Sequence, residues 1–314
     1  MVGSASLAVL VSGLAAGQLV EALLGWCILR KVVATPRRSS WDIRAVGGIA
    51  AASFPFGLTT ILLALNLRID VLVLNHYASS RILGQFNSAV WFIISMFLGA
   101  SLLMSILFPR LSRIFADHSE VAGDYVRSLL KNALVAAALG SLLVWLFASR
   151  LVVFLFGPDF QPAAYLLRVL TPALPLVFLN TIFFYVFAAA RRRFVCLVTL
   201  SLGIGFGILL SIYLTARYGA TGAATADVGR EFLMSGLYLC FLIQGNHART
   251  AGLGLLKVFG GATALLVVGT LVTAPLHLGA LWLAAWMVFL VTGTIVVLGA
   301  PHPGEWRLLT DDNL

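Results

Sequence analysis

Three charged residues, Asp227, Arg230 and Glu231, lie within residues 219–243, a stretch that is otherwise mostly apolar or small. On a helix Asp227 and Glu231 share one face, because they are four residues apart, and Arg230 lies three residues from Asp227. In lipid each charge costs at least about 2.5–3.5 kcal/mol, so this face should meet a cavity or another helix. Two hypotheses stay open. The group is an ion pair that joins this helix to a neighbour. Alternatively it is functional, either as a carboxylate that couples ion movement to transport or as a polar cavity wall that contacts sugar hydroxyls.

Charged side chains also stand near the ends of other apolar stretches. Arg68 and Asp70 follow one such stretch, Arg150 lies near the end of another, and Arg168 lies in a third. Planar guanidinium groups suit a diphosphate, so these arginines would bind one if they converge on a single cavity, with Asp70 orienting Arg68. The alternative is that these long side chains extend to the lipid headgroups.

Glu21 is the acidic residue of the first apolar stretch, on the same helix face as Gln18. We expect it to be an ion-coupling or cavity residue that pairs with an arginine of the bundle or with a residue outside this chain, or else to lie near the cytoplasmic edge of the membrane. The sequence has no Ser-His-Asp set, and its three cysteines are far apart, with no CxxC or Cys/His spacing. The residues therefore predict no enzyme, no metal site and no cofactor.

The elements that must position these residues are membrane-spanning helices. The 314 residues are 61% hydrophobic and only 11% charged, with a mean hydropathy of +1.01, which leaves too little polar surface for a soluble domain. A spanning helix needs about 20 mostly apolar residues, which predicts an all-α integral membrane protein. Nine segments qualify: 5–29, 46–67, 83–108, 132–156, 163–190, 194–216, 220–243, 253–274 and 278–299.

Prolines and glycines inside these segments should shape the helices. Pro55, Pro172 and Pro175 are expected to bend or break the spans that contain them. The glycines of residues 203–207 lie in an apolar helix rather than after a strand, so they indicate close helix packing and not a nucleotide loop. The polar stretch 109–131 is amphipathic and predicts an interfacial helix that leads into the fourth span.

The net charge of +9 is explained by membrane topology rather than by nucleic acid. Fifteen of the 21 Lys and Arg residues lie in the loops after spans 1, 3, 5 and 7 or in the C-terminal tail. Because cytoplasmic loops carry the excess of positive charge, we expect the C-terminus in the cytoplasm and the N-terminus outside. No nucleic-acid partner is expected.

Five short patterns occur in a characteristic order. They are Asp70, Gly84–Phe86, Phe108–Ser112, Phe156–Gly157 and Gly219–Ala223. In this order and at these distances they resemble the C-terminal half of polysaccharide flippases of the multidrug/oligosaccharidyl-lipid/polysaccharide exporter superfamily. The resemblance covers roughly residues 40–245.

The resemblance implies a fold of two six-helix bundles that face each other across a cavity, of which this chain has one lobe and flanking spans. The expected parts are a single span with a basic linker at 1–44, a six-helix lobe at 45–245, two additional spans at 246–300 and a cytoplasmic tail at 301–314. Because most of the first bundle is absent, the chain would be a truncated product, or a second chain would supply the missing lobe.

The resemblance also implies a function. The chain would help to move an oligosaccharide linked to a lipid diphosphate across a bacterial inner membrane for cell-surface polysaccharide synthesis, with membrane lipid as its other partner. The alternatives are a drug or lipid II exporter of the same superfamily, and a non-transporting membrane scaffold or degenerate fragment.

Overall fold

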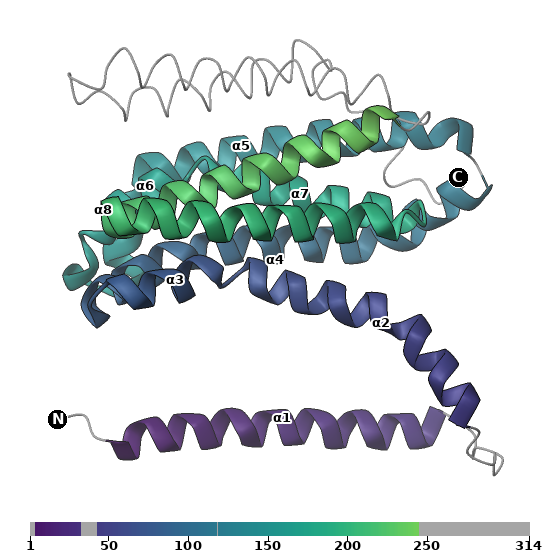
Figure 1. The fold of residues 1–314 in the computed structure, drawn as a ribbon, viewed down its shortest axis with the longest axis horizontal. Coiled ribbons are helices and arrows are strands. Elements are labelled where there is room, and N and C mark those ends of the chain that lie inside the picture. Colours follow the sequence, from purple (N-terminus) through teal and green to yellow (C-terminus); the bar gives the residue numbers. More distant parts are fainter. Residues whose placement is uncertain (1–3, 33–42, 118, 245–314) are drawn as a thin grey trace. The chain divides into compact units, whose positions relative to one another are not determined.

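A computed structural model describes residues 4–32, 43–117 and 119–244, and these residues form helices and no strand (Figure 1). The chain divides into two compact units at Phe54–Pro55, and each is described by itself. The first unit holds α1 (Ser4–Val32) and the beginning of α2 (Ile43–Asn66). The described side chains of α1 are exposed, Glu21 among them.

The second unit begins with the rest of α2 and contains six further α-helices and one short 3-10 helix. Their bounds are α3 (Ile69–Tyr77), α4 (Ser80–Asp117), α5 (Ser119–Phe156), η1 (Pro158–Phe160), α6 (Ala163–Leu170), α7 (Ala173–Ala189) and α8 (Arg193–Gln244). Helices α4, α5 and α8 pack against α7, and α3 packs against α8 (Figure 1). Two apolar clusters form the core: one surrounds Phe183 and Tyr125, and the other surrounds Phe86 and Leu167.

Two expected spans are broken helices rather than straight ones. The end of α2 and α3 meet at a bend of 46° at Leu67–Arg68, and α6 and α7 meet at a bend of 47° at Thr171–Pro172. Pro172 stands at the second bend, as predicted for a residue whose ring obstructs the preceding helical turn. The first bend falls at a point without a proline, twelve residues after Pro55.

Helix α8 turns back on itself at Gly219, so its halves are two neighbouring antiparallel helices. Gly219 has φ 58° and ψ −137°, which is not helical, and a glycine adopts this conformation without the strain that a side chain brings. The halves are close enough at this end that a Cβ on Gly222 would lie 2.0 Å from the carbonyl oxygen of Leu214. The sequence prediction of two spans, 194–216 and 220–243, corresponds to these halves.

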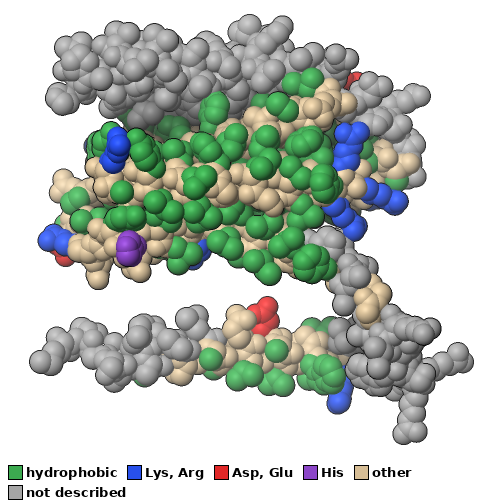
Figure 2. Space-filling model, viewed as in Figure 1, with side chains coloured by type: hydrophobic (Ala, Val, Ile, Leu, Met, Phe, Trp, Pro, Cys, Tyr) green, Lys and Arg blue, Asp and Glu red, His purple; other side chains and the backbone are tan. Residues whose placement is uncertain are grey.

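Among the described residues, three helices are long and apolar enough to cross a membrane, or up to five if each bent pair is one span. The outside of the second unit is largely apolar (Figure 2), with side chains such as Phe154 85% exposed, as expected of a surface in lipid. The chain is therefore an all-helical membrane protein. The spans expected at 253–274 and 278–299, and the tail at 301–314, lie outside the described residues, so the expected number of nine stays a prediction.

The polar stretch 109–131 differs from its prediction. It does not form a separate interfacial helix: residues up to Asp117 continue α4, and residues from Ser119 begin α5. Both helices have 38 residues, about 57 Å at a rise of 1.5 Å per residue, so each exceeds the thickness of a bilayer. The physical reason is that a helix can carry polar residues once it has left the hydrocarbon, and it need not end there.

Candidate functional site

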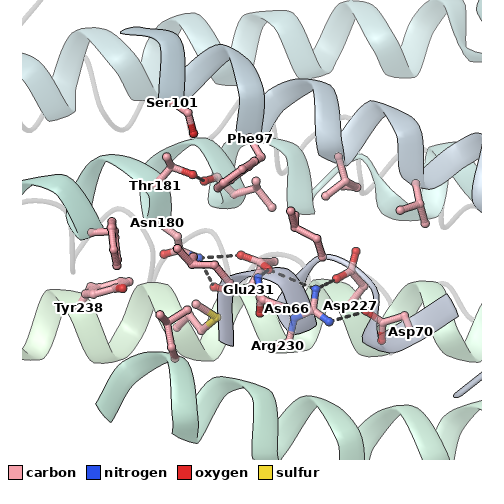
Figure 3. A pocket seen from close by; sticks show the side chains of 18 of the residues that line it. Asn66, Asp70, Phe97, Ser101, Asn180, Thr181, Asp227, Arg230, Glu231 and Tyr238 are labelled. Atoms are coloured by element: carbon pink, nitrogen blue, oxygen red, sulfur yellow. Dashed lines mark hydrogen bonds and ion pairs between the residues drawn. The ribbon is translucent and has the colours of Figure 1, made fainter. Parts of the chain in front are cut away.

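A cavity of about 70 Å³ lies where the bend between α2 and α3 meets α4, α7 and the second half of α8 (Figure 3). One wall is apolar and includes Phe97 and Met234. The other wall is polar and is formed by Asn66, Asp70, Asn180, Thr181, Asp227, Arg230 and Glu231. A water molecule needs about 10–15 Å³ of such volume, so the cavity has room for a few waters or a small ion and none for a sugar diphosphate.

Arg230 is the centre of the polar wall and binds three carboxylates. Its Nη1 donates to Asp70 Oδ2, while its Nη2 donates to Asp227 Oδ1 and, at 3.3 Å, to Glu231 Oε1 (Figure 3). All four residues are at most 5% exposed. Two of these bonds are local to α8, whereas the bond to Asp70 joins α8 to the first turn of α3. We call these four residues the charge cluster.

A second layer of amide groups holds Glu231. Asn180 Nδ2 donates to Glu231 Oε2 at 2.9 Å and to the Glu231 carbonyl oxygen at 3.0 Å. Asn66 Nδ2 donates to Glu231 Oε1 at 3.3 Å, and Ser235 Oγ donates to Asn180 Oδ1 at 2.8 Å. Glu231 therefore connects the last residue of α2, the middle of α7 and the second half of α8.

The charge cluster has an excess of negative charge. Three carboxylates surround one guanidinium, so the fully ionised cluster carries a net charge of −2 away from water. Asp70 Oδ1 and Asn66 Oδ1 are buried, and no donor among the described residues reaches either oxygen. Uncompensated charge is costly in a low-dielectric interior. A positive charge added at the cavity would offset this cost.

Two glycines in the first half of α8 make room for the cluster. A Cβ on Gly207 would lie 2.6 Å from Arg230 Cδ, and a Cβ on Gly203 would lie 2.4 Å from Met234 Cγ. The predicted close packing is confirmed at these two positions and does not occur at Gly205, which has nothing within 4 Å. The absence of a side chain at Gly207 thus leaves the space through which the Arg230 side chain extends to Asp70.

The other arginines predicted to bind substrate lie away from the cavity. Arg68 is exposed, and Arg150 is exposed with its Cζ 5.9 Å from the centre of the Phe147 ring. Arg168 is partly buried, and its Nη2 donates to Ser149 Oγ at 3.2 Å. None of these three arginines lines the cavity. Asp70 does line it, but its partner is Arg230 and not Arg68.

Two residues of the site escaped the sequence reasoning. Asn180 was not considered, although it is a lone amide in the otherwise very apolar helix α7, which is a usable signal. Asn66 stands at the end of an apolar stretch, two residues before Arg68, where a polar residue is common and gives no signal of its own. Among the described residues, no group of three His, Cys, Asp or Glu side chains is arranged to hold a metal ion.

Comparisons with known proteins agree with the fold. The structure is similar to that of the lipid II flippase MurJ in an inward closed conformation, with a TM-score of 0.58 and 13% sequence identity. The similarity covers 92% of this chain and 60% of that chain, so the chain spans about 60% of the length of this relative. No protein of curated function matches the sequence.

The sequence itself matches a family model. The model is described as polysaccharide biosynthesis protein, and it matches residues 2–165, which include Asp70. The predicted resemblance to polysaccharide flippases is confirmed by this match together with the MurJ-like fold. Because the match takes in just over half of the 314 residues, the chain belongs to the polysaccharide biosynthesis protein family.

Proposed function

We propose that this chain is the ion-coupled lobe of a flippase that moves a lipid-diphosphate-linked oligosaccharide across the bacterial inner membrane for surface polysaccharide synthesis. Membership of a polysaccharide biosynthesis family and a flippase-like fold support the general class. The observation that carries the proposal is the charge cluster, because charge this deep in an apolar helix bundle usually marks an ion or substrate pathway. The basic loops support a cytoplasmic C-terminus.

The cluster can couple an ion to helix movement. Arg230 joins α3 to α8, and Glu231 joins α2, α7 and α8. A proton or a Na⁺ bound at the cluster changes the balance of charge around Arg230 and weakens the bond that holds α3 at its bend. The bend at Leu67–Arg68 then has two preferred arrangements, one for each charge state of the cluster.

The substrate needs more space than this lobe provides. A cavity of about 70 Å³ does not hold an oligosaccharide, and the three remaining arginines do not line it. We therefore propose that the lipid-linked sugar passes between this lobe and a facing lobe, which a second chain or further sequence supplies. Arg68, Arg150 and Arg168 then remain proposed contacts for the diphosphate outside the cavity, and Glu21 remains a proposed polar contact of α1.

The proposal is tested by export of surface polysaccharide in cells that depend on this chain for it. Asp227→Asn and Glu231→Gln remove a negative charge with little change of shape, and we expect each to lower export at least tenfold at equal protein level. The matched control is Asp124→Asn, which changes an exposed carboxylate on α5 and should leave export within twofold. Full export by both cluster variants would contradict ion coupling at this site.

The same cells separate the alternative functions. Loss of polysaccharide with Arg68→Ala and Arg150→Ala, at unchanged drug tolerance, supports the oligosaccharide as substrate over a drug. A non-transporting scaffold predicts the opposite pattern: deletion of the chain abolishes export, while every charge variant that accumulates normally restores it.

A further inference from the structure

Arg110 ends a long uncharged stretch of α4. The preceding charged residue of this helix is Arg81, and the residues between them are all uncharged. The separation of 29 residues corresponds to about 44 Å at a rise of 1.5 Å per residue, which matches a bilayer of about 40–45 Å with its headgroups. If Arg81 lies at one surface of the membrane, Arg110 therefore lies among the headgroups of the other.

One edge of the Arg110 guanidinium has no partner. The side chain is partly buried, yet Nε and Nη2 are both sheltered, and neither has an acceptor among the described residues. These two nitrogens form one edge of the planar group, and their parallel N–H bonds make the fork that binds two oxygens of a carboxylate or phosphate. A permanent charge with an unused fork indicates that an anion binds here.

The ring of Tyr125 on α5 contacts the Arg110 guanidinium. The Arg110 Cζ lies 5.7 Å from the centre of the Tyr125 ring, so the ring supports one face of the guanidinium. The Tyr125 side chain is 1% exposed, and its hydroxyl also has no partner among the described residues. A phosphate has enough oxygens to accept from the fork and from a hydroxyl at once.

Basic residues surround this end of the second unit. Figure 2 shows Lys and Arg side chains gathered at its right-hand end. The exposed Arg113 of α4 and the exposed run Arg191–Arg193, which ends at the first residue of α8, belong to one packed region, because Leu111, Ala189 and Cys196 share a core cluster. Their field attracts anions. At headgroup depth the abundant anion is the phosphate of a lipid.

We propose that Arg110 and Tyr125 form a binding site for the phosphate of a membrane lipid at the end of the helix pair α4–α5. The lipid is an anionic phospholipid or the polyprenyl diphosphate carrier, which offer the same chemistry. This site is separate from the charge cluster, because neither residue lines the cavity. The proposal does not depend on the proposed function, and it holds even if the chain exports nothing.

The test is native mass spectrometry of the full chain, purified in a non-ionic detergent. Four probes are added in turn: phosphatidylglycerol, polyprenyl diphosphate, inorganic phosphate and diacylglycerol, which lacks a phosphate. We expect Arg110→Gln to weaken binding of the preferred phosphate-bearing lipid about tenfold or more, since it removes a charged fork. Tyr125→Phe should weaken it about threefold to tenfold. Arg113→Gln makes the same charge change at an exposed site of the same helix and should stay within twofold.

Each outcome supports or overturns the proposed phosphate site. Loss of phosphatidylglycerol binding in Arg110→Gln identifies a phospholipid site, and loss of polyprenyl diphosphate binding identifies a carrier site. Equal weakening by Arg113→Gln, unchanged binding by Arg110→Gln, binding of inorganic phosphate alone, or equal binding of diacylglycerol would each overturn the proposal. If Arg110→Gln does not accumulate, Arg110→Lys keeps the charge without the fork and is expected to lose the same lipid.

Discussion

Replacement of Gly207 by alanine should disturb the charge cluster from the first half of α8, which contributes no charge to it. The new Cβ would lie 2.6 Å from Arg230 Cδ and 3.0 Å from Arg230 Cγ. Carbon atoms normally approach to about 3.5–4.0 Å, so the stem of the arginine must move by about 1 Å. The stem has little freedom to do so, because its guanidinium is bonded to Asp70 on α3 and to Asp227 on α8.

Two opposing effects set the magnitude. Overpacking of a buried site costs about 1–3 kcal/mol, while alanine in place of glycine stabilises a helix by about 0.5–1 kcal/mol. We therefore expect Gly207→Ala to lower the free energy of unfolding by about 1–2 kcal/mol, and by more if the bond to Asp70 breaks. Gly205→Ala gains the same helix propensity with nothing within 4 Å, so it should be stabilising or neutral.

Chemical unfolding in detergent measures both variants under the same conditions. The difference between Gly207→Ala and Gly205→Ala isolates the crowding of Arg230 from helix propensity. In an Arg230→Ala background the stem is gone, so Gly207→Ala should no longer destabilise, which a double-mutant cycle detects. Equal stability of the two glycine variants would contradict the inference that Gly207 positions Arg230. The same holds if the effects of Gly207→Ala and Arg230→Ala on the free energy of unfolding are additive.

Contacts of Asn180, Gly222 and Arg168 can be tested in the same way. Asn180→Leu should lower the free energy of unfolding by about 2–4 kcal/mol in the same assay, because Glu231 loses two hydrogen bonds, and an unchanged value would contradict the second layer of amides. Gly222→Ala should prevent accumulation of the folded chain, since its Cβ would meet a main-chain carbonyl oxygen at 2.0 Å, and normal amounts of protease-resistant protein in membranes would count against the tight hairpin. Arg168→Gln should lower polysaccharide export about tenfold at equal protein level, because Arg168 is a proposed diphosphate contact, and export within twofold of the wild type would remove it from those contacts.

Local features of the site could be predicted from the sequence. The spacing of Asp227, Arg230 and Glu231 placed them on one helix face, and the structure has all three on one wall of the cavity. Pro172 predicted a bend where one occurs. These features depend on residues within one or two helical turns, so the period of the helix and the geometry of the backbone decide them.

The long-range partners could not be predicted. Asp70 and Arg230 are 160 residues apart, and only the packing of α3 against α8 makes them neighbours. Arg68 was as good a candidate by type and position as Asp70, yet it lies exposed at the bend before α3, whereas Asp70 is buried in the first turn of α3 and meets Arg230. Whether charged side chains meet depends on how the helices pack, and residue type alone does not determine the packing.

Under the proposed function, the charge cluster exchanges a proton or a small cation inside the membrane. Infrared difference spectroscopy of the purified full chain tests this without any need for a facing lobe or a substrate. Addition of Na⁺ or a rise in pH should remove a band of protonated carboxyl groups in the wild type and in Asp124→Asn. The same band should be absent from the difference spectrum of Asp227→Asn. Identical spectra for the wild type and Asp227→Asn would contradict ion exchange at this cluster.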